Sequence, residues 1–97
     1  MEESKAGDDE LVRATILKKL FLARRFGGKH LPFRFVIQGL PNRFHNLAKK
    51  LAKKMVSEGL LLSKISTGEE HISINPERTK EVIEIVERVF PELKDRL

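Results

Sequence analysis

The hydrophobic residues of this 97-residue chain recur mainly at three- and four-residue steps, which is the spacing of amphipathic helices. The clearest stripe predicts a helix over 43–58 with one apolar face and one polar face. A second stripe predicts a helix from about Glu10 to Phe26 that is apolar on two sides, so two neighbours pack on it. A third predicts a last helix that ends near Phe90. The apolar face of the helix over 43–58 consists of Phe44, Leu47, Ala48, Leu51, Ala52, Met55 and Val56.

Residues typical of helix ends separate these segments. Gly27 and Gly59 follow the first and second long stripes, where glycine readily adopts the left-handed conformation that ends a helix. Asn42 is a favourable cap for the helix over 43–58. Asn75 followed by Pro76 is a typical start for the last helix.

Two strand-like runs lie between the second and third long helices. Leu60 to Ser66 and Glu69 to Ile74 flank Thr67-Gly68, which predicts a β-hairpin. An additional short strand is expected at Lys29 to Leu31. The chain therefore combines helices with a small sheet.

The segment after Pro32 has two possible structures. Phe33, Val36, Ile37 and Leu40 follow a helical spacing, whereas Phe33, Phe35 and Ile37 also alternate as in a strand. The helix is favoured because Gly39 is a natural terminator and Leu40-Pro41 suits a tight turn.

The resulting order is helix, short strand, short helix, tight turn, basic helix, β-hairpin and C-terminal helix. This order resembles the winged helix-turn-helix DNA-binding family and is similar to small archaeal winged-helix proteins. The residues that carry the resemblance are Gly39-Leu40-Pro41 as the turn, 43–58 as the third helix, and "GLLLSKISTGEEHISINPE" as the wing. The resemblance implies an α+β, mostly α fold, with one winged-helix domain at 9–97. The acidic composition of the first residues predicts a flexible tail at 1–8.

Charge is sorted along the chain. Residues 11–66 hold 13 of the 19 basic residues and a single acid, Glu58, so this stretch has a net charge of +12. Residues 1–10 and 67–97 have net charges of −4 and −3. A concentration of like charge is expected to be neutralised by a partner of opposite sign, and nucleic-acid phosphate is the common one.

Other chemistry is not indicated. The chain has no cysteine, its three histidines are far apart in sequence, and its acidic pairs lie on exposed segments, so we expect no metal, no cofactor and no enzymatic activity. No apolar run approaches the roughly 20 residues that cross a bilayer. The acidic N-terminus lacks the order of a secretion signal, which predicts a cytoplasmic protein.

If the family's docking mode applies, the helix over 43–58 corresponds to the recognition helix in the DNA major groove. Arg43 then suits a bidentate contact to guanine and Asn46 one to adenine. His45 is nearer the buried boundary and less suited. The remaining basic side chains suit phosphates. The expected DNA-binding residues are Arg43, Asn46, Lys49, Lys50, Lys53, Lys54, Arg34, Lys29 and Lys64, with His71 also on the wing.

The wing departs from the family's pattern. Its tip, Thr67-Gly68-Glu69-Glu70, is acidic where DNA-contacting wings usually carry Arg or Lys. A purely structural wing is therefore the alternative to a wing that contacts DNA.

The expected function is binding of double-stranded DNA in transcription regulation or in chromatin and genome maintenance. One alternative is a protein-interaction winged helix, including a homodimer, that uses Leu17, Phe21 or Leu22 on the first helix, or the acidic C-terminal helix. RNA binding remains open because RNA phosphates attract the same lysines. Binding to a membrane surface is disfavoured, since the apolar stripe of "LAKKLAKKMV" is needed for the core.

Overall fold

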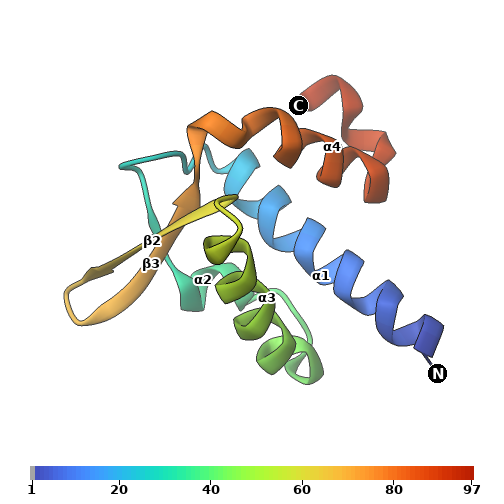
Figure 1. Cartoon of the computed structure of the whole chain (residues 1–97), viewed down its shortest axis with the longest axis horizontal. Coiled ribbons are helices and arrows are strands. Elements are labelled where there is room, and N and C mark those ends of the chain that lie inside the picture. The colour runs from blue at the N-terminus through green and yellow to red at the C-terminus, as the bar shows by residue number, and fades with distance from the viewer. Residues whose placement is uncertain (1) are drawn as a thin grey trace.

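The longest helix, α1 (Glu2–Leu22), runs through the centre of the structure, a computed structural model that describes residues 2–97 and side chains from Gly7 onward (Figure 1). Helix α3 (His45–Ser57) and helix α4 (Thr79–Val89) both pack against α1. The prediction that the first helix packs against two neighbours is confirmed. The buried residues of α1 are Val12, Ala14, Ile16, Leu17, Leu20 and Phe21.

Both predicted ends of the first helix were wrong. The helix begins at Glu2 rather than Glu10, so the backbone at 2–8 is helical; the flexibility of this tail stays a prediction, and Met1 lies outside the described residues. At the other end, Arg24 adopts a left-handed φ of 59°, and the amides of Arg24 and Arg25 donate to the carbonyls of Phe21 and Leu20. This pair of hydrogen bonds is a Schellman motif, which ends the helix before Gly27.

The three strands form one antiparallel sheet in the order β1-β3-β2, with β1 at Leu31–Pro32, β2 at Leu61–Ser66 and β3 at Glu69–Ile74. The first strand lies one or two residues after its predicted position at 29–31. The hairpin is confirmed. Thr67 and Gly68 have φ values of 52° and 80°, as a two-residue turn between twisted strands requires.

The segment after β1 is helical, as favoured above, and forms α2 (Phe33–Ile37). The next helix was predicted to begin at Arg43 with Asn42 as its cap, and this was wrong. Asn42–Phe44 forms a 3₁₀ turn without a side-chain cap, and α3 begins at His45. The amide of Phe44 donates to the carbonyl of Pro41, a shorter-range hydrogen bond than an α-helix makes.

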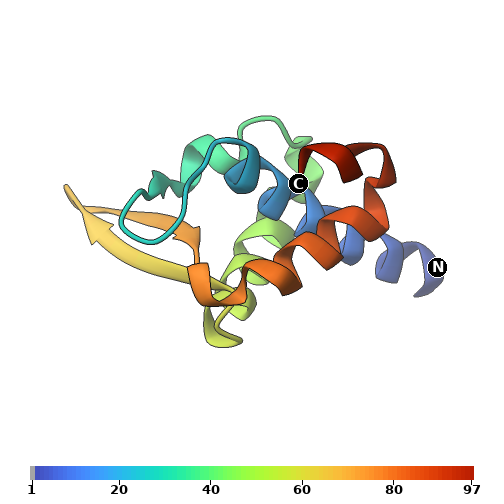
Figure 2. The same cartoon turned by 90° about the horizontal axis from the view of Figure 1, so that it is seen from above.

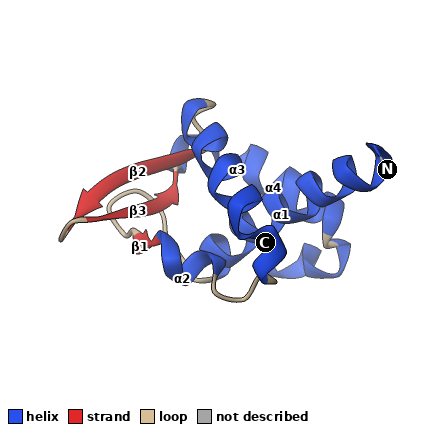
Figure 3. Cartoon of the chain, turned by 90° about the horizontal axis from the view of Figure 1, so that it is seen from below, coloured by secondary structure: helices blue, strands red, loops and turns tan. Residues whose placement is uncertain are grey.

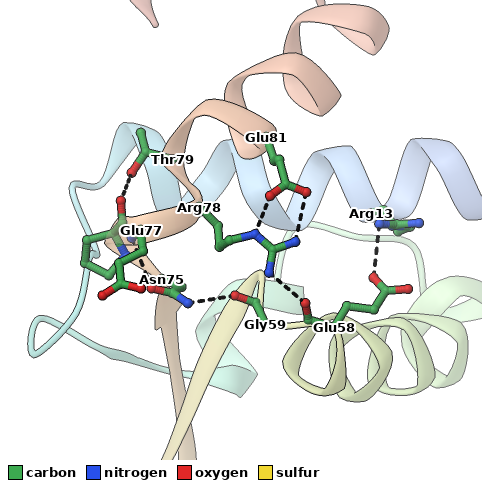
Figure 4. A network of polar contacts seen from close by, with 9 residues as sticks. Arg13, Glu58, Gly59, Asn75, Glu77, Arg78, Thr79 and Glu81 are labelled. Carbon is green, nitrogen blue, oxygen red and sulfur yellow. Dashed lines mark hydrogen bonds and ion pairs between the residues drawn. The ribbon is translucent and has the colours of Figure 1, made fainter.

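Helix α3 ends at Ser57, followed by Gly59 in the left-handed conformation at φ 85°. A polar network joins this end to the start of α4 (Figure 4). Asn75 accepts from the amide of Glu77 and donates to the carbonyl of Gly59, so the predicted cap is confirmed for a 3₁₀ turn at Pro76–Arg78, and α4 itself begins at Thr79. Arg78 donates to the carbonyl of Glu58 and to the carboxylate of Glu81. The wing is thus fixed between two helix ends.

The Arg78–Glu81 ion pair also shifts the pKa values of both side chains. The hydrogen bond between the two side chains raises the pKa of Arg78 and lowers the pKa of Glu81. Both groups are therefore charged at neutral pH, and the interaction persists until Glu81 is protonated in acid.

The hairpin of β2 and β3 projects from one end of the helical body, away from both termini (Figure 2). Strand β1 lies beside β3 and leads directly into α2 (Figure 3). Four helices around one core and a three-stranded antiparallel sheet make an architecture consistent with a winged helix. Among the described residues, no helix is long and apolar enough to cross a membrane.

Candidate nucleic-acid interface

Helix α3 exposes lysines on one face, and the apolar residues of its other face pack against the core. Ala48, Leu51, Ala52 and Met55 are at most 5% exposed and fix the helix against the core. The remaining positions include four exposed lysines, and none of them forms an ion pair with any side chain between Gly7 and Leu97. These four are Lys49, Lys50, Lys53 and Lys54, here called the α3 lysines.

Arg43 and Asn46, the expected base-reading residues, lie at the other end of this surface. Arg43 is exposed in the 3₁₀ turn, and its guanidinium lies 4.6 Å from the ring centre of Phe44. Asn46 is exposed in the first turn of α3. His45 instead contacts the carbonyl of Leu40 through its Nε2 at 2.8 Å, so its ring is already engaged within the fold.

Arg34 is held by the wing. Its Nε donates to both carboxylate oxygens of Glu69, at 3.0 and 2.8 Å, from 35 residues away in sequence. The same guanidinium lies 4.5 Å from the ring centre of Phe35. Arg34 is therefore not a free cation, and one of the two acids of the wing tip is neutralised by it.

A groove of about 430 Å³ separates α3 from the wing. Lys49, Lys50 and Lys53 form one side of it, and Glu70 of β3 forms the other. The carboxylate of Glu70 accepts a hydrogen bond from the hydroxyl of Ser63 at 2.6 Å, which orients it from the neighbouring strand. Phe33 and Ala52 are the apolar residues that line this groove.

This groove is not among the features that the sequence predicts. A two-residue turn at Thr67-Gly68 pairs Ile65 with Glu70, and that register was available from the sequence. What the sequence could not indicate is that Phe33, from α2, lies across from this part of the ribbon.

Lys64, another expected DNA-binding residue, lies on the opposite face of the wing. Lys64 is the cross-strand partner of His71. Glu70 is adjacent to His71 in β3, so its side chain points to the other face of the ribbon. Lys29 is exposed in the loop before β1. The structure therefore does not bring Lys29 or Lys64 into the groove with the α3 lysines.

A histidine pair occupies the Lys64 face of the wing. The Nδ1 atoms of His30 and His71 are 2.7 Å apart, so the N–H of one ring donates a hydrogen bond to the ring nitrogen of the other. Partial burial, together with the nearby charges of His71, Lys64 and Arg25, lowers the pKa of His30. No group of three or more metal-ligating side chains occurs in the described part of the chain.

The residues considered for a protein interface on α1 are mostly internal. Leu17 and Phe21 are 0% and 5% exposed, so neither is available to a partner. Leu22 and Leu11 are 36% and 41% exposed on the same helix. An interface through Leu17 and Phe21 would require the domain to open.

Comparison with models of protein families, with curated proteins and with solved structures gives no match.

Proposed function

We propose that this protein binds double-stranded DNA through the α3 lysines, with Arg43 and Asn46 contacting base edges. The observation that carries the proposal is the set of four exposed lysines on one rigidly packed helix face, none of which forms an ion pair with a described side chain. Held in this way, the cations are set at one-turn intervals along a face that suits a line of phosphates. Transcription regulation or chromatin and genome maintenance in the cytoplasm is the proposed setting.

The groups differ in the chemistry they offer. Lysine ammonium groups are point charges on flexible stems, which suit phosphates of any sequence. The guanidinium of Arg43 and the amide of Asn46 present paired hydrogen-bonding atoms that match guanine and adenine edges. Affinity is therefore assigned to the lysines and sequence preference to Arg43 and Asn46.

Fluorescence anisotropy of a labelled duplex at several salt concentrations tests the proposal. With about four phosphates neutralised, the logarithm of the association constant should fall with the logarithm of salt concentration at a slope of about −4. Binding that is absent even at low salt would refute duplex binding.

The division of roles has its own test. Lys50→Ala or Lys53→Ala should weaken all duplexes about equally and reduce the salt slope by about one. Arg43→Ala and Asn46→Ala should instead reduce the difference between the best and worst duplexes selected from a random pool. Equal effects of both sets would contradict this assignment.

A further inference from the structure

The groove between α3 and the wing contains one acid among lysines, and this acid is well positioned. Glu70 is fixed by the hydroxyl of Ser63, while its neighbour Glu69 is neutralised by Arg34 on the other face of the ribbon. The acidic wing tip is therefore not a uniform negative surface. It presents one oriented carboxylate to the groove.

An ionised carboxylate only accepts hydrogen bonds, so Glu70 repels phosphate and selects a ligand that donates. Two parallel N–H donors match its two oxygens best. Among the nucleobases, guanine offers this arrangement, with N1–H beside the N2 amino group. Thymine has one N–H between two carbonyl oxygens, which the carboxylate disfavours.

The rest of the groove suits the faces of a base and its backbone. Phe33 is partly buried and lines the groove, where an aromatic ring can stack on a base. Ile65 is 69% exposed and is the cross-strand partner of Glu70 on the same ribbon face, so it adds an apolar contact. Lys49, Lys50 and Lys53 lie opposite Glu70, where flanking phosphates would be neutralised. The groove volume of about 430 Å³ lies within the range of small-ligand sites.

We propose that this groove binds an unpaired guanine of a DNA strand, with Glu70 accepting from its Watson–Crick edge and Phe33 stacking on its ring. In a duplex the same edge is occupied by cytosine, so the proposed site selects a base that is out of the pair. This proposal rests on the proposed function only in that Lys49, Lys50 and Lys53 contact phosphates both in duplex binding and in binding of the unpaired guanine.

The test uses the full-length protein and a labelled oligothymidylate of about eleven nucleotides, with guanine, hypoxanthine or thymine at its centre. The guanine strand should bind about tenfold more tightly than the all-thymine strand, since charged hydrogen bonds have this order of strength. Hypoxanthine retains N1–H and lacks the amino group, so its strand should fall between the two. Equal binding of the three strands would overturn the proposal.

Glu70→Gln keeps the shape of the side chain and removes its charge. The guanine-to-thymine affinity ratio should fall close to one in this variant. Glu84→Gln on α4 makes the same charge change away from the groove, and it should leave the ratio at about ten. A ratio that Glu70→Gln leaves unchanged would exclude Glu70 as the reader of the base.

Phe33→Leu tests the stacking contact. It should weaken all three single strands about fivefold, the order of one base–aromatic stack, with the guanine ratio retained. Circular dichroism checks that this variant is folded, and the Glu70→Gln result stands independently of it. Free dGMP should displace the guanine strand only at concentrations far above the strand's dissociation constant; displacement at equal concentration would show that the strand is not part of the ligand.

A fully paired duplex in the same assay separates this proposal from the proposed function. Duplex binding with no guanine preference among single strands would overturn the groove proposal alone. Guanine-dependent binding of single strands without duplex binding would support the groove and refute the duplex function.

Discussion

Helices α3 and α4 pack against the same central helix, yet their exposed faces carry charge in opposite ways. The exposed face of α3 has four lysines and no carboxylate, whereas α4 carries Lys80 and Arg88 together with three glutamates. Two ion pairs lie on or next to α4, Arg78–Glu81 and Arg88–Glu10. Both helices bury apolar stripes on the inner side. Burial therefore explains why both helices fold against α1, but it does not explain the excess of lysines on the outer face of α3.

The first prediction concerns the core that the two helices share, and it has the largest expected effect. Leu17→Ala should lower the free energy of unfolding by about 2–5 kcal/mol, because it removes a fully buried side chain and leaves a cavity. Leu22→Ala should change it by less than about 0.5 kcal/mol, since this residue is at the surface. Urea denaturation measures both, and equal losses would show that the shared core is misassigned.

The second prediction addresses the outer faces directly. Lys50→Glu combined with Lys53→Glu should weaken duplex DNA binding about a hundredfold, as two phosphate contacts are replaced by repulsion. Lys80→Glu combined with Lys94→Glu makes the same charge change on the C-terminal part of the chain and should weaken binding by less than about threefold. Anisotropy at one fixed salt concentration compares the two. Similar losses would mean that net charge, rather than the face of α3, governs binding.

The third prediction extends the comparison to the wing, where Arg34 is neutralised by Glu69. Glu69→Gln should release Arg34 to a phosphate, which makes duplex binding about threefold tighter and the salt slope steeper by about one. Glu84→Gln on α4 removes the same charge without freeing a cation at the interface. If the two variants tighten binding equally, Arg34 does not reach the DNA.

The fourth and smallest prediction concerns pH and the histidine pair. Because the pKa of His30 in the folded protein lies below its ordinary value of 6.5, the unfolded chain takes up this proton first as the pH falls. The stabilisation from neutral His30 is complete above pH 6.5 and is lost as the pH falls toward the folded pKa. Thermal unfolding should therefore show a larger fall in Tm from pH 7.5 to pH 5 in the wild type than in His30→Gln. The same change in Tm with pH in both proteins would show that His30 does not contribute to the pH dependence of stability.

The helices and the hairpin could be predicted from the sequence because their signals are local. The apolar spacing of 43–58 and the turn at Thr67-Gly68 depend on residues a few positions apart. The first helix was placed less well. Its end at Leu22 depends on a left-handed Arg24, and no residue preference marks arginine for that conformation.

The candidate site was predicted in part. The α3 lysines are exposed on one face, as their spacing indicated, because amphipathic helices turn such residues to solvent. Lys64 was expected to contact DNA from the wing, and the alternation of β2 and β3 places it on the other face of the ribbon from Glu70. Arg34 was expected to contact the DNA backbone, and in the structure its guanidinium is paired with Glu69.

The sequence by itself determined which segments become helices and strands, their order, and the one-sided basic character of α3. These properties follow from hydrogen bonds and side-chain spacing within single elements. Only the tertiary structure decided that Arg34 meets Glu69, that His30 meets His71, and that Glu70 lines a groove with Phe33 and three of the α3 lysines. These contacts join residues 35 or 41 positions apart in the two pairs, and they depend on how α2, α3 and the wing pack around the shared core.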